Sequence, residues 1–207
     1  MMNLKKHRLF VAALAVTAAF SMAACGNSKE SEAEPTDDLQ TECPIESPEP
    51  ADYSASELFS KMDTTDLDGN TVDSSVFVEN NLTLVNVWNV GCTPCVEEIP
   101  VLDKLNKEYE GKGVSIKGLY YDFTEGISDE SRQEVEEILA DAKAEYQQLL
   151  LSKDMTETEA MSELGVFPTT YLVDSEGHII DTLEGSNDYD GWKAVIEAAL
   201  KQVKGDV

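Results

Sequence analysis

The chain has 207 residues, and 41 acidic side chains outnumber 15 Lys and Arg, which gives a formal net charge of −26 at pH 7. A surface this acidic repels nucleic acid and anionic lipid headgroups, so we expect neither as a partner. The charge bears on solubility and partners, and it leaves the fold open.

Residues 1–24 have the layout of a secretory signal peptide. A basic start with Lys5, Lys6 and Arg8 precedes an apolar stretch of about 12 residues and a small-residue end. The stretch is too short to span a bilayer comfortably, and the alternative is an uncleaved N-terminal anchor. Removal of this segment takes away three basic and no acidic residues, so the net charge falls from −26 to about −29.

Cys25 directly follows Ala23 and Ala24, and this run resembles the lipobox of bacterial lipoproteins. The resemblance implies that Cys25 becomes the acylated first residue of the mature protein. The lipid would then tether the chain to the outer, extracytoplasmic face of the cell membrane without a membrane span. The alternative is an ordinary signal peptide that leaves Cys25 free.

Residues 25–52 are rich in Ser, Glu, Asp, Pro and Thr, and nine acidic residues face the single basic residue Lys29. This composition predicts a disordered linker, which would carry the lipid at its first residue. The remaining residues 53–207 are enough for one domain with a sizeable core.

Strand and helix patterns alternate along residues 53–207. A short hairpin is expected around the turn at Asp68-Gly69-Asn70. The later expected segments are, in order, a strand over Leu82 to Val90, a helix over Pro94 to Tyr109, a strand over Val114 to Tyr121, a helix over Asp129 to Ala144, a strand over Tyr146 to Leu151, a short helix over Thr156 to Leu164, strands over Thr169 to Asp174 and His178 to Leu183, and a helix over Trp192 to Val203. This order predicts the α/β class, with a central mixed sheet flanked by helices.

Cys92 and Cys95 form a Cys-Thr-Pro-Cys motif where the buried strand passes into the first long helix. Cys92 would therefore face unpaired backbone N–H groups and the positive end of the helix dipole, which favour a thiolate. A thiolate attacks disulfides, and Cys95, one turn later, could release the mixed disulfide. Pro94 is tolerated in the first helical turn. The pair is our candidate redox centre.

Two other readings of the pair stay open. A zinc site would need further ligands, and Cys25, Cys43 and His178 do not supply a paired spacing, so we expect no metal. A purely structural disulfide is also possible in an oxidising compartment.

The residues around the motif resemble the active-site region of TlpA/ResA-type thiol–disulfide oxidoreductases. The similarity lies in Val85-Asn86-Val87-Trp88, in the Cys-Thr-Pro-Cys motif, and in Gly165 to Asp174 with its Phe167-Pro168. It implies a thioredoxin-like fold with an N-terminal β-hairpin and a helix–strand insertion between the core strands. It also implies no cofactor beyond a redox-active Cys92–Cys95 disulfide.

The resemblance implies roles for four further residues. Pro168 would follow a cis peptide bond and lie against the cysteine pair. With Phe167 and Trp88 it would form the substrate-binding part of the site, and Trp88 is also expected to lie in the core beside the pair. Glu98 matches a glutamate thought to influence proton transfer of the thiols, and the alternative is a solvated carboxylate on the helix surface. Gly91 departs from the family, where Trp commonly precedes the first cysteine, and this predicts a more open site.

The charges around the cysteine pair favour a reductant over an oxidant. No Lys, Arg or His occurs between Asp73 and Asp103, while Glu97 and Glu98 follow the pair, and like charges disfavour a thiolate. We therefore expect a monomer that reduces disulfides of a protein client. In the family that the chain resembles, apocytochrome c is a usual client. A thiol protein embedded in the membrane would then supply the electrons that reduce the pair again.

Two competing functions belong to the same fold. The first is a binding module that holds a polypeptide in the groove between Cys92 and Pro168 without turnover. The second, a peroxide-reducing relative, lacks an evident lone cysteine with a resolving partner. Cys43 reads as an incidental thiol or as a second partner for Cys92, and His178 as an exposed loop residue.

Overall fold

A computed structural model describes residues 56–122 and 127–205 of the chain. The predicted signal peptide, Cys25, the linker and Cys43 lie outside the described residues, and so do the first three residues of the predicted domain. Within the described residues, no helix combines the length and the apolar character needed to cross a membrane.

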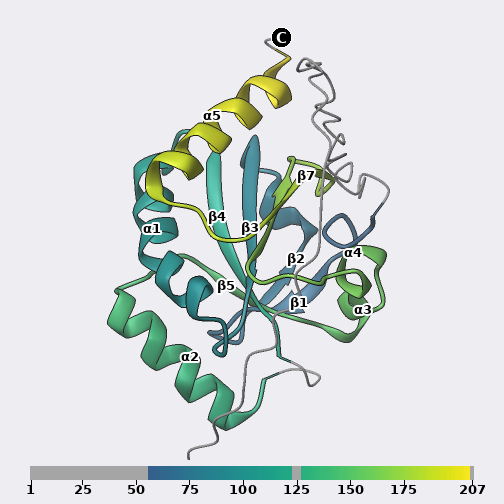
Figure 1. Cartoon of the computed structure of the whole chain (residues 1–207). Coiled ribbons are helices and arrows are strands. Elements are labelled where there is room, and N and C mark those ends of the chain that lie inside the picture. The colour runs from purple at the N-terminus through teal and green to yellow at the C-terminus, as the bar shows by residue number, and fades with distance from the viewer. Residues whose placement is uncertain (1–55, 123–126, 206–207) are drawn as a thin grey trace, which may run out of the picture. The chain divides into compact units, whose positions relative to one another are not determined.

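A five-stranded mixed sheet with the order β5-β4-β3-β6-β7 forms the centre of the described part of the chain (Figure 1). β3 (Leu82–Trp88) and β4 (Val114–Tyr120) pair in parallel, and β5 (Gln148–Leu150) extends this parallel part. β6 (Thr169–Val173) and β7 (Ile179–Glu184) run antiparallel to their neighbours. All seven residues of β3 are buried, as its apolar sequence and central position require.

Helices cover both faces of the sheet, as predicted. On one side lie the long helices α1 (Thr93–Tyr109), α2 (Asp129–Ala142) and α5 (Tyr189–Lys204). On the other side lie α3 (Lys153–Thr156) and α4 (Glu159–Ser162). The hairpin of β1 (Asp63–Thr65) and β2 (Thr71–Asp73) and the short 3-10 helix η1 (Ser74–Phe77) also belong to this second side.

Two apolar clusters hold these layers together, one on each face of the sheet. Successive side chains of β3 point to opposite faces, so Leu84 and Trp88 join the cluster that includes Trp192 of α5, whereas Val85 and Val87 join the other. The alternation places the polar residue Asn86 on the same face as α1 and α5. That position matters for the site described below.

The expected elements are confirmed with small shifts in their ends, and two local differences stand out. The short helix expected over Thr156 to Leu164 is two helices, because the Thr158 hydroxyl donates to the Met155 carbonyl at 2.8 Å and the chain restarts a helix after it. The 3-10 helix η1 was not expected. The Asp73 side chain initiates it by accepting from the backbone N–H of Ser75 at 2.9 Å.

Candidate active site

The two cysteines of the motif are joined in a disulfide at the start of α1, with the sulfurs 2.01 Å apart. Cys92 is the N-cap of α1, and its sulfur accepts from the backbone N–H of Cys95 at 3.3 Å. Cys92 is half-buried, whereas Cys95 is fully buried. Only the Cys92 sulfur is therefore accessible to a partner, which fits an attacking first cysteine and a resolving second one.

The loop between β3 and α1 presents Cys92 through a tight turn. The backbone N–H of Gly91 donates to the Asn89 side chain at 3.0 Å, and the N–H of Cys92 donates to the Asn89 carbonyl at 3.2 Å. A Cβ on Gly91 would lie 3.3 Å from the Asn89 side-chain oxygen, so glycine suits this turn. Gly91 is exposed and places no side chain beside the disulfide.

Pro168 follows a cis peptide bond after Phe167, as the resemblance implied. The next residue, Thr169, pairs with Val87 near the end of β3, so Pro168 lies at the same end of the sheet as the cysteine motif. Phe167 is half-buried, and its ring meets the edge of Tyr121 with 5.3 Å between centroids. Beside it, Val166 is 39% exposed and supplies an apolar surface at this end of the sheet.

Glu98 is buried, with 2% of its surface exposed, so the reading as a solvated carboxylate is wrong. One carboxylate oxygen, Oε1, accepts from the backbone N–H of Asn187 and from the indole N–H of Trp192, each at 2.6 Å. The other, Oε2, accepts from the Asn86 amide at 3.1 Å. Burial raises the pKa of Glu98, and these three hydrogen bonds oppose that rise.

Asn86 links Glu98 to the strand that follows Pro168. Its side-chain nitrogen donates to Glu98 and also to the Thr170 hydroxyl at 2.9 Å, while its side-chain oxygen has no hydrogen-bond partner among the described residues. This buried amide therefore connects β3, α1 and β6 in one polar cluster.

Trp88 lies in the core, as expected, and its complete burial does not fit the substrate-binding role that was also predicted for it. Its indole N–H donates to the Gln148 side chain at 3.0 Å, and its ring packs edge-on against Tyr120. The close packing of Gln148 requires Gly118, since a Cβ there would lie 1.8 Å from the Gln148 oxygen. Trp88 supports the site from the core and has no surface for a client.

Asn187 and Trp192 are the site residues that sequence reasoning missed. They lie 89 and 94 positions after Glu98 and reach it only because α5 packs against α1 and β3. The helical pattern placed Trp192 in a closing helix, and nothing in the sequence indicated that its indole would meet a carboxylate.

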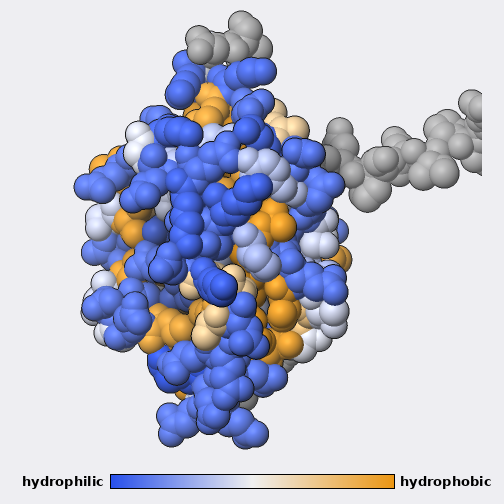
Figure 2. Space-filling model, turned by 90° about the vertical axis from the view of Figure 1, so that its left-hand side faces the viewer, coloured by the Kyte–Doolittle hydropathy of each residue, from blue (hydrophilic) through white to orange (hydrophobic). Residues whose placement is uncertain are grey.

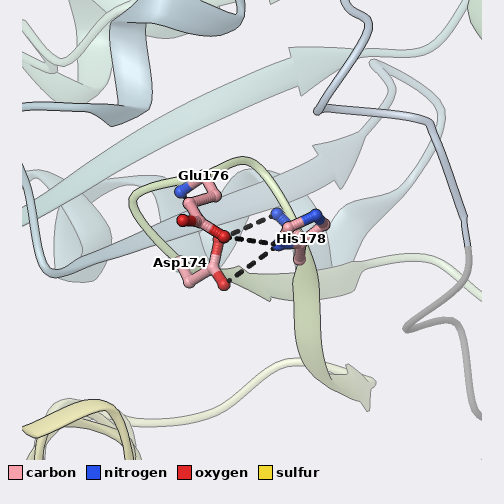
Figure 3. A group of neighbouring side chains, drawn as sticks. All are labelled: Asp174, Glu176 and His178. Carbon is pink, nitrogen blue, oxygen red and sulfur yellow. Dashed lines mark hydrogen bonds and ion pairs between the residues drawn. The ribbon is translucent and has the colours of Figure 1, made fainter.

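Figure 3 shows a second group of polar side chains, Asp174, Glu176 and His178, in the turn between β6 and β7. Their ligand atoms lie within 4.8 Å of one another, and His178 is exposed, as expected. One Asp174 oxygen accepts from the backbone N–H groups of Glu176 and His178 at 2.8 and 2.9 Å. These hydrogen bonds explain why the three side chains lie together: Asp174 stabilises the β-turn to which all three belong.

The fold and this site define a member of a thioredoxin-like class. The family model described as AhpC/TSA family matches residues 56–182, and the chain belongs to this family. Its resemblance to the TlpA/ResA type is confirmed by its relatives.

One such relative is the thiol-disulfide oxidoreductase ResA of Oceanobacillus iheyensis, which is 28% identical over 129 residues. The match covers 61% of this chain and 60% of that relative, so the chain spans less than two thirds of the relative's length.

Solved structures agree on the fold. The solution structure of a thiol:disulfide interchange protein from Bacteroides sp. has a TM-score of 0.52 and 28% identity, covering 66% of this chain and 84% of that one. The thioredoxin domain of a thiol-disulfide oxidoreductase from Bacteroides vulgatus has a TM-score of 0.50 and 29% identity, covering 65% and 91%. The predicted thioredoxin-like fold is thus confirmed.

Proposed function

We propose that the chain is a thiol–disulfide oxidoreductase that reduces disulfides of a protein client through Cys92 and Cys95. The observation that carries the proposal is the disulfide at the start of α1, with an accessible first sulfur and a buried second one. The names of the relatives support the same chemistry.

The reaction follows from this asymmetry. The Cys92 thiolate attacks one sulfur of the client disulfide, forming a Cys92–client bond and breaking the client's S–S bond. The released client sulfur takes up a proton. Cys95 then loses its proton and attacks the Cys92 sulfur, which restores the disulfide seen here and releases the second client sulfur. Two electrons pass to the client, and the protein ends oxidised.

Glu98 is placed to take part in the second step. It follows Cys95 by three residues on α1, and both side chains are buried, so they face the same side of the helix. We assign to its carboxylate the acceptance of the proton that Cys95 loses. The three hydrogen-bond donors to Glu98 among the described residues are all uncharged.

The direction of electron flow rests on the same electrostatics. The first two turns of α1 carry Glu97 and Glu98 and no basic residue. Strong oxidants of this fold are strong because their reduced thiolate form is stabilised. Negative charge beside the pair withholds that stabilisation, which supports a reductant.

We further propose that a lipid on Cys25 tethers the domain to the outer face of the cell membrane through the linker of residues 25–52. The lipobox-like run and the preceding signal-like segment support this. The electron donor would then be a membrane-embedded thiol protein.

We also propose that the protein acts as a monomer. Most of the face in Figure 2 is hydrophilic, with small separate apolar areas. In the described part of the chain, the large apolar side chains with high exposure are Val78 and Val166. An extensive apolar interface would need more than these.

Trapping tests the proposed chemistry. In a Cys95→Ser variant, Cys92 can attack a client but the mixed disulfide cannot resolve, so client adducts sensitive to reductant should accumulate. A Cys92→Ser variant keeps only the buried cysteine of the pair and should trap far less. A Cys92→Ser/Cys95→Ser variant measures adducts through Cys25 and Cys43.

If Cys95→Ser formed no more adducts than the double variant, the proposal would be overturned and the binding module without turnover would be favoured. Identification of the captured protein would name the client, and a match to a haem-attachment protein would support a role in cytochrome c maturation.

A further inference from the structure

The buried carboxylate of Glu98 is anchored from the far end of the chain. Two of its three hydrogen bonds come from one segment: the backbone N–H of Asn187, in the loop after β7, and the indole N–H of Trp192, in the first turn of α5. Both reach Oε1 at 2.6 Å, shorter than the 3.1 Å bond from Asn86 to Oε2. The shorter hydrogen bonds to Glu98 therefore come from α5 and the loop that precedes it.

Trp192 itself is fixed by its surroundings. It is fully buried in the cluster that also contains Cys95 and Ile99 of α1. The start of α5 is defined by the Asp188 side chain, which accepts from the backbone N–H of Gly191 at 2.8 Å. An indole held this rigidly keeps its N–H directed at Glu98 with little loss of side-chain freedom.

We propose that Trp192 is a positioning residue whose indole N–H keeps the Glu98 carboxylate ionised and oriented, so that it can accept the proton of Cys95. The inference rests on the proposed exchange chemistry and deepens it. It assigns the pH dependence of the resolving step to a residue 97 positions beyond Cys95 and outside the redox motif.

The sign follows from the carboxylate's environment. Burial already raises the pKa of Glu98, and the Trp192 hydrogen bond opposes that rise. Loss of the indole donor must therefore raise the pKa further, because the charged form loses a partner while the burial remains. At a given pH below that pKa, fewer molecules then carry the proton acceptor.

The neighbouring charged groups do not replace Glu98 in this role. Burial raises the pKa of Tyr146, which precedes β5, so it stays neutral over the working range. Along α1, Asp103 accepts from the backbone N–H of Glu145 and pairs with Lys107. At the start of α5, Asp188 and Asp190 are exposed, and Lys193 pairs with Glu108. Asn86 on β3 and Thr170 on β6 are uncharged.

Native protein provides a first test that needs no variant. The chain has two tryptophans, and only Trp192 donates its indole N–H to a carboxylate, whereas Trp88 donates to the neutral Gln148. In ¹H–¹⁵N spectra of the oxidised protein, the Trp192 indole signal should shift with pH at the midpoint of the Glu98 carboxyl signal. The Trp88 signal should not follow it. The proposal would be overturned if both indole signals shifted with pH in the same way. It would also be overturned if the Trp192 signal did not shift at the midpoint of Glu98.

A Trp192→Phe variant tests the effect on the reaction. We expect the midpoint of the pH–rate profile for resolution of a Cys92–glutathione mixed disulfide to rise by about one unit, which is about tenfold in rate below the midpoint. The Glu98 midpoint in carboxyl NMR spectra should rise with it. The double variant Glu98→Gln/Trp192→Phe should have the same pH–rate profile as Glu98→Gln alone.

Trp88→Phe is the matched control, because it also removes a buried indole donor, but from a neutral partner. It should leave the carboxyl midpoint of Glu98 in place. An equal shift in both tryptophan variants, or an unshifted Glu98 midpoint in Trp192→Phe, would contradict the proposal. The NMR midpoint is measured without turnover, so failure of the exchange chemistry is distinguishable from failure of the positioning role.

Discussion

Glu98 is the residue where the physical chemistry of the site is most sharply defined. A carboxylate that is 2% exposed and has three uncharged donors keeps its hydrogen bonds satisfied but remains costly to ionise. A protein under pressure for stability alone would do better with a neutral side chain here. The presence of a buried titratable group beside a redox pair is typical of a functional site.

Because Glu98 is costly to ionise, we expect the free energy of unfolding to depend on pH. Burial raises the pKa of Glu98 above its ordinary value of 4.5, so the folded state holds a proton that the unfolded state releases. The stability that Glu98 contributes is full below about pH 4.5 and is lost as the pH rises through the folded pKa. Glu98→Gln removes this loss. Its free energy of unfolding relative to the native protein should therefore increase between about pH 4 and pH 8 in denaturant titrations.

Glu97→Gln is the matched control, because it removes an exposed carboxylate from the same turn of α1. If the relative stability of Glu98→Gln stayed constant or fell with rising pH, the account of a costly buried carboxylate would be wrong.

At the scale of elements, the sequence was sufficient to predict the framework that presents the cysteines. The apolar run of β3 and the helical spacing of α1 predicted a strand that passes directly into a helix, with Cys92 at the junction. α1 continues through Pro100, whose side of the helix is exposed. These features are local, because hydrophobic period and turn chemistry decide them within a few residues.

Contacts between distant elements could not be predicted in this way. A core position for Trp88 could be predicted, and strand alternation directs it there, but its contact with Gln148 on a distant strand could not. Likewise, whether Glu98 is solvated or buried depends on where α5 packs, and its donors Asn187 and Trp192 come from that helix and its preceding loop. A single sequence contains Glu98 and both donors, but it does not show that they form hydrogen bonds with one another.

For the whole molecule, the acidic charge bears on how the proposed tether would work. With a net charge of −26 and no polybasic segment beyond the signal-like start, the chain is repelled by anionic headgroups. Attachment would therefore depend on the lipid at Cys25. One acyl chain alone gives only marginal binding, so the multiply acylated form of a lipoprotein is required.

Replacement of Cys25 tests the tether. Cys25→Ala should move the protein from the membrane fraction to the soluble extracytoplasmic fraction, because the lipid on Cys25 is the attachment that we propose. A Cys43→Ala variant is the matched control and should stay with the membrane. Retention of Cys25→Ala in washed membranes would instead indicate an uncleaved N-terminal anchor.

Whether Cys92 and Cys95 form a reductant can be decided from the reduction potential of this pair. Equilibration of the purified domain against defined ratios of reduced and oxidised dithiothreitol, followed by thiol counting, measures the potential. The account predicts a value near that of thioredoxin, about −270 mV. A value near the strongly oxidising end of the fold, about −120 mV, or a pair that stays oxidised under the strongest reducing ratio, would contradict it.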